Sequence, residues 1–183
     1  MSLQYLFLLV NALNFMVPIL LASVGEIITE RSGIVNIGLE GILNLSAFIA
    51  AIVSFITGNS LLGLFAGTAA GTFLGLVHGA ASTYLKGDQI VIGIGINMVS
   101  YGIGVLGLIA LWKQYGASPR IPSLPSISVA EGCSLSPLAL IAIAIAVGVW
   151  WLLARTSVGL RIRACGENPR AADAMGIKVY RVR

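Results

Sequence analysis

The sequence predicts an all-α, polytopic bundle of about five transmembrane helices, followed by a short helix on the cytoplasmic side. Hydrophobic residues make up 57% of the 183 residues and charged residues only 10%, whereas a soluble domain carries about 25% charged residues. One core could not bury this much apolar surface, so the chain needs a bilayer as its solvent. We therefore expect one multi-pass transmembrane domain over residues 1–183, with residues 155–183 as a cytoplasmic segment.

Five apolar runs define the expected spans. Each is long enough, or nearly so, to cross a hydrocarbon core of about 30 Å at ~1.5 Å per residue. Each must be helical, because lipid offers no hydrogen-bond partner to open backbone groups. The first run has no preceding Lys or Arg and is too long for a signal peptide, so we expect it to be retained. The runs are Leu3–Val24, Gly41–Thr57, Leu61–Leu85, Ile90–Trp112 and Pro137–Ala154.

The basic tail sets the expected orientation. Residues 155–183 hold seven Lys or Arg and two Asp or Glu. Such a block either binds nucleic acid or, beside a membrane, marks the cytoplasmic side; the second interpretation fits this composition. Counting spans back from the tail places residues 26–40 inside and both the N-terminus and residues 113–136 outside. Three prolines within residues 113–136 predict an irregular, extended loop there.

The third run carries glycine at every fourth position. Successive positions of this spacing stack along one side of a helix, where they form a groove against which another helix backbone can pack closely. The alternative is that this spacing arises by chance in a glycine-rich chain, but five glycines in strict register favour tight helix packing. The residues are Gly63, Gly67, Gly71, Gly75 and Gly79.

Polar residues near the spans suggest a translocation path. Asn97 and Tyr101 share one face of the fourth run, and that face either lines a polar path or buries hydrogen bonds between helices. Residues 25–41 mix four charges with apolar residues. They indicate either a broken helix, as found at transport sites, or an amphipathic helix on the membrane surface. Asn36 and Glu40 from this segment complete the candidate path with Asn97 and Tyr101.

The tail contains the signals of a compact helix. Asn168 is a favourable N-cap, Pro169 suits the first helical position and Gly176 suits the C-terminal stop. Alanines and one methionine between them give a small surface. Such a helix just inside the membrane is either a docking element for a cytoplasmic partner or an ordinary surface helix.

Catalytic, metal and cofactor sites are not predicted. No nucleophile–base pair is visible, and Cys133 and Cys165 lie on opposite sides of the last run, which disfavours a disulfide or a metal site. No P-loop sequence is present, so any ATP would be bound by another subunit. We expect the chain not to be an enzyme.

Several motifs resemble the permeases of ABC importers. Ala171-Ala172-x-x-x-Gly176 is similar to their Glu-Ala-Ala-x-x-x-Gly loop, except that Arg170 replaces the glutamate. The string from Gly159 to Pro169 resembles the ribose-permease-like branch, which imports simple sugars and nucleosides. Further matches fall at residues 30–41, 88–91 and 95–98, and the nearest variant belongs to permeases that work with purine-nucleoside-binding lipoproteins.

The resemblance implies a role and partners. It implies a bacterial plasma-membrane permease without its own cofactor, acting with a cytoplasmic ATP-binding subunit, a second permease subunit and an external substrate-binding lipoprotein. Members of this branch continue with further spans, so we expect an N-terminal fragment. The implied ATPase-coupling residues are Glu167, Asn168, Pro169, Arg170, Ala171, Ala172, Asp173 and Gly176.

A secondary transporter without an ATPase is the alternative function. It would need an ionisable group inside the membrane, and His78 alone lies well inside an apolar run.

Overall fold

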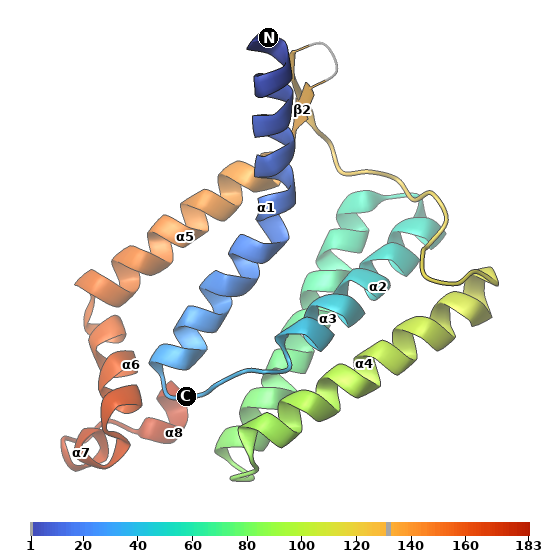
Figure 1. The fold of residues 1–183 in the computed structure, drawn as a ribbon. Coiled ribbons are helices and arrows are strands. Elements are labelled where there is room, and N and C mark those ends of the chain that lie inside the picture. The colour runs from blue at the N-terminus through green and yellow to red at the C-terminus, as the bar shows by residue number, and fades with distance from the viewer. Residues whose placement is uncertain (1, 131–132) are drawn as a thin grey trace. The chain divides into compact units, whose positions relative to one another are not determined.

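The computed structural model describes residues 2–130 and 133–183 (Figure 1). Within them, five helices are long and apolar enough to cross a membrane, which confirms the predicted fold class: α1 Ser2–Arg31, α2 Leu39–Thr57, α3 Ser60–Thr83, α4 Gln89–Trp112 and α5 Pro137–Arg155. The shorter elements are β1 Ile127–Ala130, β2 Cys133–Leu135, α6 Ser157–Glu167, α7 Pro169–Ala174 and α8 Val179–Val182. The chain divides into two compact units, one of residues 1–33 with 124–182 and one built on residues 34–123.

The second unit consists of α2, α3 and α4. The turn between α2 and α3 begins at Gly58 in the left-handed conformation (φ 66°), which glycine adopts without steric cost. The Asn59 side chain then caps α3 by accepting from the backbone N–H of Leu61 at 2.9 Å. Asp88 caps α4 in the same way, accepting from Ile90 N–H at 2.8 Å. These caps satisfy backbone donors that neither lipid nor the helix itself can satisfy.

Helix α2 packs against one half of the glycine groove of α3. A Cβ atom on Gly63 would collide with Ser54 Oγ, and one on Gly67 would lie 2.9 Å from Ala50 Cβ and from the Ser46 carbonyl oxygen. A Cβ atom on Gly71 would lie 2.8 Å from Ser46 Oγ, which is the end of a side chain and can move aside, and at least 3.7 Å from its other neighbours. No described atom lies within 4 Å of a Cβ placed on Gly75 or Gly79. Helix α2 thus lies against the groove at Gly63, Gly67 and Gly71, and the packing role of the five glycines in the assembled protein stays a prediction.

The α2–α3 contact gives a direct test. Gly67→Leu should separate the two helices, because backbone and Ala50 atoms leave no room for the side chain, at a cost of about 3 kcal/mol. Gly75→Leu makes the same chemical change eight residues further along α3, in the open part of the groove. Thermal unfolding in detergent should show a lower midpoint for the first variant and an unchanged midpoint for the second. Equal midpoints would mean that this contact contributes nothing.

The first unit pairs α1 with α5, and the two helices run in the same direction. At one end, Asn14 donates from Nδ2 to the Ser134 carbonyl at 2.8 Å and accepts from Ser136 N–H at 2.9 Å. Next to this anchor, Val17 packs against Ala139 and Ala142 in a small buried cluster. The shared direction agrees with the predicted crossing of the first and fifth spans.

Three local features differ from the expectations. The loop predicted to be irregular contains the antiparallel pair β1–β2, whose strands are only four and three residues long. The basic tail holds α6 as well as the predicted helix. The first helix continues past Val24 to Arg31, so residues 25–31 extend a span rather than forming a surface helix. The interruption is confined to residues 32–38, where Gly33 adopts a φ of 87°.

Candidate coupling segment and helix break

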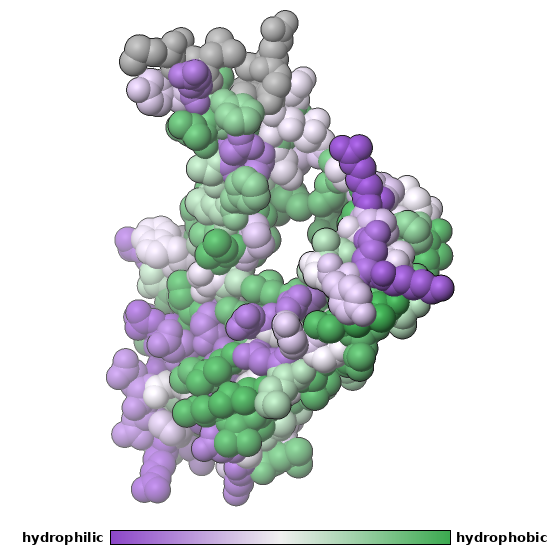
Figure 2. Space-filling model, turned by 45° about the vertical axis from the view of Figure 1, so that its right-hand side comes forward, coloured by the Kyte–Doolittle hydropathy of each residue, from purple (hydrophilic) through white to green (hydrophobic). Residues whose placement is uncertain are grey.

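The coupling segment begins at a sharp corner between α5 and α6. The Thr156 hydroxyl accepts from Gly159 N–H at 3.2 Å and so caps α6. Gly159 is buried against the backbone of Leu152 and Leu153, where a Cβ atom would collide. Glycine is therefore required at this corner, which turns the chain from the apolar α5 to the charged residues of α6. In Figure 2, purple hydrophilic side chains gather at the lower left of the view.

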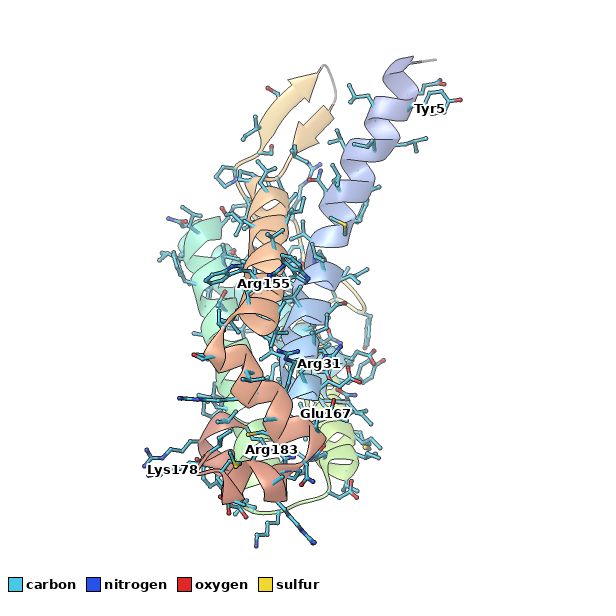
Figure 3. All side chains as sticks on the ribbon, turned by 90° about the vertical axis from the view of Figure 1, so that its left-hand side faces the viewer. Tyr5, Arg31, Arg155, Glu167, Lys178 and Arg183 are labelled. Carbon is cyan, nitrogen blue, oxygen red and sulfur yellow. The ribbon has the colours of Figure 1, made fainter. Side chains whose placement is uncertain are left out.

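The far end of α6 rests on the end of α1. A Cβ atom on Gly166 would collide with the carbonyl oxygen of Arg31 and lie 3.2 Å from the backbone nitrogen of Gly33. This close approach, which a side chain would prevent, joins the segment before α7 to the first span. Figure 3 shows Arg31 and Glu167 at this junction.

Helix α7 has the predicted caps. Asn168 Oδ1 accepts from Ala171 N–H at 3.0 Å, and Pro169 occupies the first turn. Gly176 ends the helix with a φ of 83°, and the following Ile177 N–H donates to the Ala172 carbonyl at 3.1 Å. The helix and its bounds are confirmed, while its coupling role is a prediction that geometry alone does not test.

A small core stabilises this segment and decides which side of α7 is available to a partner. Ala172 is only 4% exposed and packs with Cys165 and Val179. Its methyl group is therefore occupied within the chain, although the sequence suggested that it would face a partner. Met175, in contrast, is 83% exposed. The available surface comprises Arg170, Ala171, Asp173, Ala174, Met175 and Gly176, which we call the α7 surface, and Glu167 and Asn168 before it are also exposed.

The helix break packs against α4 through Asn97. Asn97 Oδ1 accepts from Gly41 N–H at 2.7 Å, and its Nδ2 donates to the Ile37 carbonyl at 3.0 Å. Gly38 and Gly93 meet backbone to backbone: a Cβ on Gly93 would lie 2.7 Å from Gly38 N. We call this contact of residues 37–41 with Gly93 and Asn97 the clasp.

The clasp changes the interpretation of the polar residues. Asn97 forms hydrogen bonds with backbone groups that lack a partner where the helix is interrupted. This corresponds to the second alternative for the face of Asn97, in which it buries hydrogen bonds between helices. Asn36 Oδ1 lies beside Gly38 and therefore at the clasp. Tyr101 lies elsewhere, in a hollow of about 410 Å³ that Asn44 and Ser118 also line, and Glu40 is exposed. The structure thus brings together Asn36 and Asn97, and a translocation role for all four residues stays a prediction.

Glycines at the corners and close contacts are structural features that the sequence did not single out. Gly93, Gly159 and Gly166 each have a close backbone neighbour. The chain holds 22 glycines, so sequence position alone could not show which of them have a close backbone neighbour.

The five long apolar helices of the described residues mark a multi-pass membrane protein, and the permease family and relatives reported next place it in the plasma membrane. Residues 8–183 match the family described as the branched-chain amino acid transport system / permease component, and the chain belongs to this family. No solved structure matches it.

Curated relatives share much of the sequence. The chain is 38% identical to the guanosine ABC transporter permease protein NupQ of Bacillus subtilis, covering 98% of this chain and 62% of the relative. It is 32% identical to the nucleoside ABC transporter permease protein NupC of Lactococcus lactis, covering 94% and 60%. The putative glucose ABC transporter permease protein TsgC13 of Haloferax volcanii is 33% identical over 90% of this chain and 53% of its own length. The chain thus spans between half and two thirds of the length of these relatives, which are all permease components.

Proposed function

We propose that the chain forms membrane-spanning helices of a permease subunit in an ATP-driven importer of nucleosides, with simple sugars as the second substrate class. The relatives named for guanosine and for nucleosides support the first class, and the relative named for glucose supports the second. The partners are a cytoplasmic ATP-binding subunit, a second permease subunit and an external substrate-binding lipoprotein.

The observation that carries this proposal is the construction of the α7 segment. A helix of six residues is too short to be stable alone, yet this one is capped, packed on its own core and joined to the end of α1 through α6. It presents small residues and the exposed Met175. Such a segment suits the transmission of movement from an ATP-binding subunit to the spans.

Uptake by intact cells tests the proposal. Cells that express the full transporter should accumulate labelled guanosine, and depletion of ATP should stop uptake while an intact proton gradient does not sustain it. The control is the same strain without this gene. Uptake that follows the ion gradient after ATP depletion would support the ion-coupled alternative instead.

Thiol labelling tests the proposed orientation. Cys165 is fully buried, so its lack of reaction would say little about its side of the membrane, and the Cys133 side chain lies outside the described residues. Two exposed positions serve better in a Cys133→Ser background. An impermeant maleimide should label Ser126→Cys in intact cells, and should label Met175→Cys only after the cells are opened. Labelling of Met175→Cys in intact cells would reverse the orientation.

A further inference from the structure

An apolar groove in the first unit ends at two arginines. It encloses about 280 Å³ between α1 and α5, where Val24 and Ile27 face Val149, Trp150 and Leu153. Arg31, from the last turn of α1, and Arg163, from α6, also line it. Its lining contains no carboxylate among the described residues. A groove of this kind offers an apolar channel for a hydrocarbon chain and a cationic end for a phosphate.

A second, polar hollow shares the same two arginines. It encloses about 360 Å³ and is lined by Arg31, Arg163, Gly166, Glu30 and Glu167. The groove is therefore apolar between the two helices and cationic at Arg31 and Arg163. The polar hollow shares these two arginines and adds the acidic Glu30 and Glu167. Figure 3 shows Arg31 and Glu167 on neighbouring elements at this end of the unit.

The charges at this place are available to a ligand. In the part of the chain that the structure describes, neither guanidinium lies within 4.0 Å of a carboxylate. Both arginines and both glutamates are exposed at the surface of the unit. Arginine donates two parallel hydrogen bonds to phosphate oxygens, and basic pockets between membrane helices on the cytoplasmic side bind lipid headgroups.

We propose that the groove and the polar hollow together bind one phosphatidylethanolamine molecule. An acyl chain lies along Val24, Ile27 and Trp150, the phosphate bridges Arg31 and Arg163, and the primary ammonium group lies between Glu30 and Glu167. The order of apolar, cationic and acidic groups in the site matches the order of acyl chain, phosphate and ammonium group in the lipid. Phosphatidylglycerol lacks the cation that two carboxylates require, and phosphatidylcholine carries a trimethylated cation without N–H donors. The inference does not depend on the proposed substrate or on ATP coupling.

Trp150 supplies a reporter inside the groove. The chain has three tryptophans, so Trp112→Phe/Trp151→Phe leaves Trp150 as the single emitter. The full chain is reconstituted in phosphatidylcholine bilayers that contain a small fraction of one dibrominated lipid. Brominated phosphatidylethanolamine should quench Trp150 with an apparent affinity about fivefold above that of brominated phosphatidylcholine, and also above that of brominated phosphatidylglycerol.

Charge variants separate the two parts of the site. Arg31→Gln and Arg163→Gln should each lower the affinity for phosphatidylethanolamine by about fivefold, while Lys at either position should retain most of it. Glu30→Gln/Glu167→Gln should remove the preference over phosphatidylglycerol and leave phosphate binding intact. Arg161→Gln is the matched control, because exposed Arg161 lies on α6 and lines neither hollow.

Three results would overturn the inference. Equal quenching by the three brominated lipids would show that the groove has no headgroup preference. A preference for phosphatidylglycerol would exclude the ammonium position. Protection of Trp150 from all three lipids would show that protein, either a second copy or another helix, covers the groove.

Discussion

Met175→Glu is expected to abolish transport while leaving the chain folded and inserted. Met175 is 83% exposed and belongs to none of the buried clusters found among the described residues, so a carboxylate there costs the isolated chain little. Against an ATP-binding subunit, the same carboxylate would lose its water without gaining a partner. That penalty is about 3 kcal/mol or more for a charged group, which corresponds to binding at least about a hundredfold weaker.

The measurement combines uptake with retention of the ATP-binding subunit during purification. Met175→Glu should lose both, and Met175→Leu, which keeps an apolar side chain of similar size, should keep both. Ala172→Glu serves as the opposite control: because Ala172 is buried at 4%, its carboxylate should disrupt the small core and reduce the amount of folded protein. Full uptake and an intact complex with Met175→Glu would remove the α7 surface from the coupling mechanism.

Gly93→Val is expected to unfold the clasp, whereas Gly95→Val is expected to have almost no effect. A Cβ on Gly93 would lie 2.7 Å from Gly38 N and 3.1 Å from the Ile37 carbonyl carbon. These are backbone atoms that cannot rotate away, so α4 must move. The movement also lengthens the two hydrogen bonds of Asn97, which leaves Gly41 N–H and the Ile37 carbonyl without partners. Together these effects cost about 3 kcal/mol or more.

Gly95→Val is the matched control for Gly93→Val, because both glycines lie in α4 close together in the sequence. Both substitutions exchange glycine for valine two residues apart in α4, so the change in helix propensity is the same and is slightly favourable. No atom of the described residues lies within 4 Å of a Cβ on Gly95. Thermal unfolding in detergent should separate the variants, with a midpoint several degrees lower for Gly93→Val alone. Similar midpoints would show that the close contact seen here is not maintained in solution.

The spans were predictable because their signal is local. Five apolar runs were placed from composition, and α4 and α5 begin and end within one residue of the predicted bounds. The caps of α7 were equally local, since Asn168, Pro169 and Gly176 act on neighbours within a few residues. Each of these features depends on short-range rules of hydrogen bonding and hydrophobicity, which the sequence displays directly.

The contacts between distant segments were not predictable in this way. Asn97 could line a path or bond to the backbone, and the choice depends on a partner 56 residues away in sequence. Ala172 was expected on the docking side, but its burial depends on Cys165 and Val179, which become neighbours only when α6 and α8 fold beside α7. Which of the many glycines cannot be replaced depends on the backbone that packs opposite each one. Such pairings arise from tertiary packing and have no periodic signal.

A photo-crosslinker at position 175 tests the central claim most directly. We expect irradiation of the assembled transporter to join position 175 to the ATP-binding subunit, because the proposed function places the α7 surface against that subunit. The same crosslinker at position 126, in the loop proposed to be external, should give no such product. If position 175 yields no crosslink to the ATP-binding subunit while the complex remains active, the α7 surface does not dock there and the coupling account is contradicted.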